Sequence, residues 1–447
     1  MKANSYIRSL FFSRKFYLVF VGIILLFLLA YLLPILFVPV QIALLIFVLV
    51  FLTDSILLYR LPYPITISRV MSDRFSNGDT NEVVLDVINN YKFKIRVSVI
   101  DELPVQFQMR NFELSTELSA GERKRLEYSL RPLTRGEYVF NDLNCFVRSP
   151  LSFVVRRIVV KASAIVKVYP SYQALRKYEL LAISNNLTDI GSRRLRKIGR
   201  SLEFDQVKEY VRGDDIRNIN WKATARRAGQ LMVNSYMDER SQQVYCIIDK
   251  GRVMKMPFDG MTLLDYSVNA ALILSHVAIV RQDRTGLVTF SNDVSNFMPA
   301  ERRTGQMSAI LESLYNEQTE YLETDYERLY AVIRSKVPQR SLLILFTNFE
   351  SMSSLRRQLP FLRMLARKHL LLVVFFENPQ LKELTEGDAD DVEGVYIKTI
   401  AQRFVLEKKF IVKELQQHGI MTLLTEPRQL TIQAVNKYLE LKSKQAL

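Results

Sequence analysis

Histidine, cysteine and tryptophan are scarce in this chain of 447 residues, and their scarcity excludes several kinds of chemistry. The 3 histidines, His276, His369 and His418, are far apart and form no HExxH motif or Cys/His grouping for a metal. The 2 cysteines, Cys145 and Cys246, cannot build a disulfide framework. The sequence also lacks GxxxxGK(S/T), GxSxG and GxGxxG motifs. We therefore expect no P-loop ATP site, no metal, no cofactor and no enzymatic activity.

Charge is absent from one long apolar stretch, Phe16 to Thr53. A single helix of this length would measure about 57 Å, roughly twice the ~30 Å hydrocarbon thickness of a bilayer. Pro34 and Pro39 interrupt the stretch near its middle. The sequence therefore predicts a transmembrane α-helical hairpin within residues 1–60, with crossings at Phe16–Leu33 and Val40–Tyr59.

Basic residues flank this hairpin on one side only. Four precede the first crossing and one follows the second: Lys2, Arg8, Arg14, Lys15 and Arg60. The turn between the two crossings carries no basic residue. The positive-inside rule places both termini and most of the chain in the cytoplasm. Asp54 is expected near the interface or facing the partner helix, because a carboxylate is costly in mid-bilayer.

Residues 61–170 read as short strands separated by turns. Glu82–Asn89 and Lys94–Ile100 alternate apolar and polar side chains, and Arg123–Leu130, Glu137–Val147 and Ser163–Tyr169 continue the series. Turn dipeptides such as Asn77-Gly78 lie between them. Regular spacing of this kind predicts an antiparallel β-sandwich, a module that positions or binds.

Residues 243–447 show a different pattern, in which apolar strands alternate with helices. The predicted strands include Val244–Asp249, Ser341–Asn348, Leu370–Phe376 and Ile420–Thr425. Strands that are apolar throughout predict a mostly parallel, doubly wound sheet covered on both faces. Ligands of such sheets bind at the carboxyl ends of the strands, where Asp249 and Asn348 lie.

The most informative stretch is Gly199–Arg227, which we name the signature segment; it lies within residues 171–242 and holds Trp221, the 1 tryptophan of the chain. Acids and bases alternate there among apolar residues, which indicates a paired network on a packed surface. Gly213-Asp214-Asp215 reads as a turn. Arg217 and Arg226 suit bidentate pairing with the neighbouring acids, and Trp221 is expected to pack against one of the two domains.

Five bases precede this network without an acid among them: Arg193, Arg194, Arg196, Lys197 and Arg200. They suit a flexible linker, an anionic lipid surface or an acidic protein surface. The net charge of +15 also leaves nucleic acid as a partner, with steep salt dependence as its mark. A hydrolase using Asp214 and Asp215 is less favoured, because the sequence supplies no evident nucleophile or metal set.

The run EYVRGDDIRNINWKATAR resembles the signature of the domain-of-unknown-function 58 family, bacterial membrane proteins related to von Willebrand factor A domains. The resemblance extends over the helical hairpin, the β-rich region and the α/β region. It implies a von Willebrand factor A-like fold for residues 243–447, a bacterial inner-membrane location, no known catalysis and a MoxR-type AAA+ ATPase as partner. It also marks the junction or partner-binding residues Arg212, Gly213, Asp214, Asp215, Arg217, Trp221, Lys222 and Arg226.

Relatives with this fold carry an adhesion site for a divalent cation, with the pattern Asp-x-Ser-x-Ser, a loop threonine and a later aspartate. Here the first motif begins Asp249-Lys250-Gly251-Arg252, which lacks both serines, and the later acid is Asn348. Thr304 is a candidate for the loop threonine. This degenerate set is not expected to hold Mg²⁺ well, because it retains a single strong oxygen ligand. Lys250 and Arg252 either bind a partner's carboxylate directly or belong to an edge that has lost its role.

These observations together predict a membrane-anchored cytoplasmic scaffold or adaptor. The signature segment is expected either to join the two domains or to face a protein partner.

Overall fold

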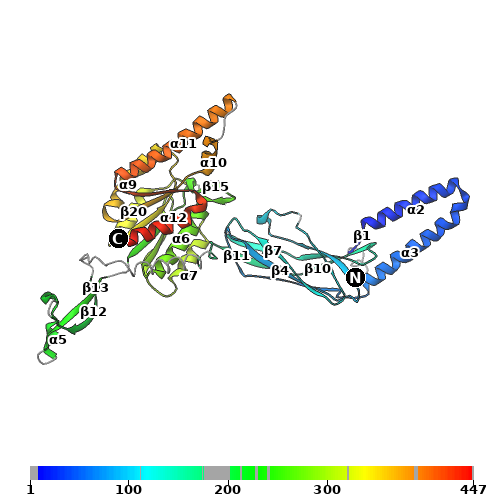
Figure 1. Ribbon diagram of the computed structural model, residues 1–447, viewed down its shortest axis with the longest axis horizontal. Coiled ribbons are helices and arrows are strands. Elements are labelled where there is room, and N and C mark those ends of the chain that lie inside the picture. The colour runs from blue at the N-terminus through cyan, green and yellow to red at the C-terminus, as the bar shows by residue number, and fades with distance from the viewer. Residues whose placement is uncertain are drawn as a thin grey trace. The chain divides into compact units, whose positions relative to one another are not determined.

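The computed structural model describes residues 9–110, 112–173, 175, 202–211, 214–226, 230–238, 242–319, 322–386 and 391–444. Contacts divide the chain into two compact units, Met1–Tyr169 and Pro170–Leu447. The first unit contains the apolar helices together with the β-rich region, and the second contains the α/β region (Figure 1).

Two apolar helices near the N-terminus form the predicted hairpin. Helix α2 spans Arg14–Leu32, a 3-10 turn η1 spans Pro34–Leu36, and α3 spans Phe37–Tyr59. Pro39 falls in the first turn of α3, where a proline removes no intrahelical hydrogen bond. Only 11% and 6% of the most apolar windows of α2 and of η1–α3 are buried. Long, exposed apolar helices of this kind suggest association with a membrane.

The β-rich region folds into one five-stranded and two three-stranded sheets. Alternation explains the packing, because Val83, Leu85 and Val87 of β4 are fully buried with polar or half-buried neighbours between them. Two apolar clusters fill the interior. The strands are β1 Leu10–Phe12, β2 Ile65–Met71, β3 Arg74–Ser76, β4 Asn81–Asn89, β5 Ile95–Asp101, β6 Leu114–Leu118, β7 Arg123–Leu130, β8 Gly136–Phe140, β9 Leu143–Arg148, β10 Val154–Val160 and β11 Ala164–Tyr169.

Three details differ from the sequence prediction. Strand β1 precedes the helical hairpin and pairs with β10, so this fold begins before residue 61. The predicted strand Glu137–Val147 is two strands, β8 and β9. Strands β3 and β11 pair in parallel, whereas an all-antiparallel arrangement was expected. Each difference depends on pairing between distant segments, which local periodicity does not specify.

The α/β region contains a six-stranded sheet in the order β18-β17-β14-β19-β20-β21. All neighbouring pairs are parallel except β17–β18. The strand order reverses between β14 and β19, which is where open α/β sheets bind ligands. The strands are β14 Gln243–Asp249, β17 Arg284–Phe290, β18 Val294–Glu301, β19 Leu342–Phe346, β20 Leu370–Phe376 and β21 Met421–Thr425.

Helices cover both faces of this sheet, as the apolar strands predicted. One face packs on α6 (Leu263–Val280), α7 (Gln306–Tyr315) and α12 (Leu430–Ser443). The other packs on α8 (Tyr326–Lys336), α9 (Met352–Lys368) and α11 (Val392–Gln417). Helix α6 is apolar enough to cross a membrane, but 78% of it is buried, so it is a core helix. Short elements complete the region: η4 Arg252–Lys255, β15 Pro257–Phe258, β16 Met261–Thr262, α10 Pro379–Glu386 and η5 Pro427–Gln429.

The carboxylate of Asp54 joins α3 to the β-sheet of the first unit. Asp54 is fully buried, and its Oδ2 accepts hydrogen bonds from the backbone N–H groups of Phe153 and Val154, both at 2.9 Å. The hydroxyl of Ser149 donates to Oδ1. A second link lies one turn later, where Tyr91 donates to the carbonyl of Leu58 at 2.6 Å. The expectation that Asp54 faces the partner helix is therefore wrong, because its donors lie between Ser149 and Val154; the alternative, a position near the interface, stays a prediction.

We predict that Asp54→Ala destabilises the first unit by about 3 kcal/mol or more, because it leaves buried donors without an acceptor. Asp54→Asn should cost less, since its amide keeps one acceptor oxygen. Thermal unfolding of the full-length chain in detergent measures the effect. The exposed neighbour Thr53→Ala is the matched control. Equal melting of the Asp54→Ala and Thr53→Ala variants would show that the junction does not stabilise this unit.

Candidate functional site

The carboxylate of Asp249 lies at the carboxyl end of β14, where the strand order of the sheet reverses; we name this place the switch point. Asp249 is 1% exposed and ends β14. Its Oδ1 accepts from the Thr324 hydroxyl at 2.7 Å and from the Gly251 N–H at 2.8 Å. Its Oδ2 accepts from the hydroxyls of Thr347 at 2.7 Å and Tyr326 at 3.4 Å. Burial raises the pKa of Asp249, and these donors oppose the rise.

The residue Gly251 makes this arrangement possible. A Cβ on Gly251 would lie 2.1 Å from the Thr324 hydroxyl oxygen and 3.0 Å from Oδ1 of Asp249. A serine at this position, as in the adhesion-site pattern, would therefore collide with the threonine. The residues present do not fit a divalent cation, because this chain's own donors already occupy both oxygens of Asp249.

The threonine hydroxyls that donate to Asp249 come from Thr324 and Thr347. Thr304, the loop threonine proposed from the sequence, is instead an exposed residue in the turn before α7. The proposal for Thr304 is therefore wrong. Thr324, which reaches Asp249 instead, lies 75 residues after that aspartate in the sequence.

Lys250 is buried in an ion pair and does not face a partner. Its Nζ lies 3.1 Å from Oε2 of Glu317, and the two side chains are 6% and 9% exposed. Oε1 of Glu317 also accepts from Thr289 at 2.9 Å. The hypothesis that Lys250 binds a partner's carboxylate is therefore wrong, because breaking a buried pair is costly. Arg252 remains 60% exposed, with its guanidinium 3.7 Å from Glu323.

Asn348 binds a lysine that sequence reasoning missed. Lys408 of α11 donates from Nζ to Oδ1 of Asn348 at 2.6 Å and to the carbonyl of Phe349 at 2.5 Å. Burial lowers the pKa of Lys408 to about 8. A lysine ammonium therefore lies against the side chain that the adhesion-site pattern would use for a cation.

The signature segment forms part of a β-hairpin, which we name the signature hairpin. Strands β12 (Leu202–Glu209) and β13 (Met232–Asp238) pair in antiparallel register, with η3 (Ile216–Asn218) and α5 (Trp221–Arg226) between them. The Asn220 side chain accepts from the N–H of Ala223 at 3.0 Å and donates to Asn234 at 2.9 Å. This asparagine fixes the start of α5 against β13.

The charges of this hairpin pair differently from the prediction. Asp214 accepts from Lys208 at 3.0 Å, and this contact lowers its pKa. Asp215 accepts from the backbone N–H of Arg217 and begins η3. Among the described residues, no ion pair joins the guanidinium of Arg217 or Arg226 to Asp214 or Asp215, although the sequence suggested such a pair. Arg212 and Gly213 lie outside the described residues.

Trp221 is exposed and does not pack in a core. Its side chain is 69% exposed, and those of Ile216 and Val211 are 68% and 63% exposed. Three exposed bases are close to these apolar residues in the sequence, on η3 and α5: Arg217, Lys222 and Arg226. Trp221 is therefore not covered by its own hairpin, which presents an apolar and basic surface, and its packing against one of the two domains stays a prediction.

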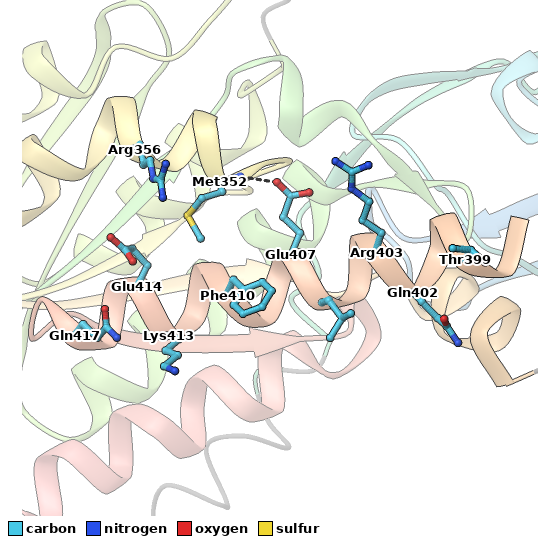
Figure 2. A pocket seen from close by; sticks show the side chains of 11 residues that line it. Met352, Arg356, Thr399, Gln402, Arg403, Glu407, Phe410, Lys413, Glu414 and Gln417 are labelled. Carbon is cyan, nitrogen blue, oxygen red and sulfur yellow. Dashed lines mark hydrogen bonds between the residues drawn. The ribbon is translucent and has the colours of Figure 1, made fainter. Parts of the chain in front are cut away.

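A groove between α9 and α11 is the second exposed feature (Figure 2). It measures about 780 Å³, and Met352, Leu406 and Phe410 supply its apolar side chains. Charged and amide side chains surround them, including Arg356, Arg403 and Lys413. Oε1 of Glu407 accepts from the N–H of Met352 at 2.8 Å and joins the two helices.

The described residues supply no evident catalytic group. Among them, no group of three or more His, Cys, Asp or Glu residues is placed to hold a metal ion. Burial raises the pKa of Cys145 and of Cys246 to about 12, so neither is a thiolate at neutral pH.

Sequence reasoning found Asp249 and the signature segment but missed the hairpin strands, Thr324, Lys408 and the groove. Alternation in LEFDQVKE was a usable signal for β12. Nothing local distinguishes Thr324 or Lys408 from other surface residues, because their roles depend on contacts across 75 and 60 residues.

Comparison with known proteins gives one family match and distant likenesses to solved structures, of which two are described below. Residues 206–402 match the family described as protein of unknown function DUF58, which confirms the resemblance seen in the signature segment. No curated protein matches the chain.

The conserved hypothetical protein BatB from Bacteroides thetaiotaomicron is 13% identical, with a TM-score of 0.32 over 46% of this chain and 100% of BatB. The CARDB domain of a Pyrococcus furiosus protein, solved in complex with di-metal ions, is 17% identical, with a TM-score of 0.17 over 24% of this chain and 93% of that domain. Likenesses this distant establish neither fold nor function.

We predict that Gly251→Ala destabilises the α/β region by about 1–3 kcal/mol, because the new methyl displaces the Thr324 hydroxyl. Thr324→Ala should relieve part of this cost, so the double variant is more stable than the sum of the single changes by roughly 0.5 kcal/mol or more. Unfolding of the full-length chain measures this cycle. Thr347→Ala, which removes the other threonine, should give no relief. Additive costs for Gly251→Ala and Thr324→Ala would contradict the close approach.

Proposed function

Starting from the DUF58 region at residues 206–402, we propose that this chain is a membrane-anchored scaffold or adaptor that binds a protein partner and catalyses no reaction. The partner that the family resemblance implies is a MoxR-type AAA+ ATPase. Together they would assemble or remodel a complex of the bacterial envelope. The hairpin α2–α3 would cross the inner membrane, with both termini and the remaining chain in the cytoplasm.

The observation that carries this proposal is the exposed surface of the signature hairpin. Ile216 and Trp221 are 68% and 69% exposed, although a monomer gains nothing from exposing them. Tryptophan with neighbouring arginine is the composition typical of interface hot spots. Arg217 and Arg226 favour a partner surface that carries carboxylates.

We also propose that the α/β region is a von Willebrand factor A-like domain without a working adhesion site. The strand order and the single antiparallel edge strand support this fold. The donors around Asp249 and the Lys250–Glu317 pair support the loss of the cation. In this account the domain is a rigid support for exposed binding surfaces, and the switch-point edge binds no ligand.

The net charge of +15 also suits an anionic surface such as nucleic acid, but the exposed tryptophan and isoleucine favour a protein. An apolar contact persists at high salt, whereas phosphate contacts weaken steeply. The bases at Arg193–Arg200 that suggested a lipid or acidic surface lie outside the described residues.

We predict that the tagged full-length chain, gently solubilised from its membrane, copurifies with a MoxR-type ATPase in a nucleotide-dependent manner. The double variant Ile216→Ser/Trp221→Ala should reduce recovery about tenfold or more, since the loss of hot-spot contacts costs 1.4 kcal/mol or more. Ile432→Ala, which removes an apolar side chain that is 45% exposed on α12, is the matched control. Recovery of no ATPase with any nucleotide, or equal recovery with the double variant, would contradict the proposal.

A further inference from the structure

We propose that the groove between α9 and α11 is a second binding surface, and that it binds an acidic amphipathic helix of a partner protein. This inference rests on described residues of the α/β region alone and does not depend on the signature hairpin. The groove is lined by Met352 and Arg356 of α9 and by one face of α11 (Figure 2).

Four exposed apolar side chains of α11 form a stripe along one face of the helix, whereas Ile397, Ile400 and Phe404 are exposed on another side. Val392, Tyr396, Leu406 and Phe410 are 88%, 68%, 51% and 58% exposed. Their spacing and that of the groove-lining Thr399 keep them on one face, separated by whole helical turns. From Val392 to Phe410 the stripe is about 27 Å long at 1.5 Å per residue. An apolar stripe of this length on a helix matches a second helix, packed side by side.

The stripe lies on the side of α11 that does not pack against the core. Its opposite face buries Ile411 and Leu415 against the sheet. Its N-terminal half, next to α10, extends beyond the sheet (Figure 1). The stripe is therefore not the exposed remainder of a core-facing side, but a separate face without cover from the described part of this chain.

The charges at the groove favour a partner that carries carboxylates. Of the two acids there, Glu407 accepts a hydrogen bond from the Met352 N–H, and Oε1 of Glu414 lies 3.7 Å from Nε2 of His418, which makes an ion pair only when that imidazole is protonated. The cations Arg356, Arg403 and Lys413 are exposed, and the described residues provide none of them with an ion pair or side-chain hydrogen bond. Apolar side chains with cations beside them complement a helix whose apolar face is flanked by Asp or Glu.

The same helix argues against an anionic lipid surface. Asp391 and Glu393 are exposed at its N-terminal end, beside Val392 and Tyr396. A helix that lies on anionic lipid is typically rich in bases along its whole polar face. The acids at this end would be repelled by lipid phosphates, whereas a protein helix can place a base opposite them.

The test uses the full-length chain in nanodiscs of neutral lipid and two synthetic 18-residue helical peptides. Both peptides carry one leucine stripe; one has Glu at the flanking positions and the other has Lys. Fluorescence anisotropy should show that the Glu peptide binds at least tenfold more tightly. Leu406→Ser/Phe410→Ser should weaken this binding tenfold or more, and Arg356→Glu/Arg403→Glu/Lys413→Glu should reverse the preference between the peptides.

Equal affinity for the two peptides, or an unchanged preference after charge reversal, would overturn the proposal. So would sedimentation showing that Phe410 drives self-association, or vesicle binding that Phe410 controls. The charge-reversed residues are exposed, so that variant keeps the test valid if the serine variant does not fold. Ile216→Ser/Trp221→Ala should leave peptide binding unchanged, which separates failure of this inference from failure at the signature hairpin.

Discussion

The interaction on which the α/β region depends is the set of hydrogen bonds that the chain donates to one buried carboxylate, that of Asp249. Asp249 ends the central strand at the switch point, where a charge without donors would be strongly destabilising. Hydroxyls from Thr324 and Thr347 supply the donors, and Gly251 leaves room for one of them. At the edge where such sheets usually bind ligands, the chain's own groups therefore make the hydrogen bonds to the carboxylate.

Two lysines near Asp249 are likewise paired within the chain, so binding of a partner is expected at other surfaces. Lys250 is neutralised by Glu317, and Lys408 fills the position beside Asn348. Exposed apolar and basic side chains instead occur together at the groove beside α11 and on the signature hairpin. The same physical rule operates in the first unit, where the buried side chain of Asp54 accepts hydrogen bonds from the backbone N–H groups of Phe153 and Val154.

The sequence was sufficient for features that repeat along the chain. Uncharged length and two prolines predicted the helical hairpin to within a few residues, and apolar strands alternating with helices predicted a sheet covered on both faces. The signature run led to the family. These features follow from local periodicity, composition or a long motif.

The features that failed depend on contacts between distant residues. Lys250 carried the correct charge for a partner's carboxylate, but Glu317, 67 positions later, reaches it first. Trp221 is apolar enough for a core, yet it is 69% exposed on the signature hairpin. Strand β1 has only three residues, too few for a periodic signal, and exists because β10 pairs with it.

The central claim is that this chain's own donors replace a cation at Asp249, so that exposed surfaces carry its function. Calorimetric titration of Mg²⁺ into the full-length chain in neutral nanodiscs tests it most directly. The account predicts no saturable heat up to about 1 mM Mg²⁺, since the hard cation would have to displace donors from both carboxylate oxygens. Saturable micromolar binding that Asp249→Asn abolishes would contradict it.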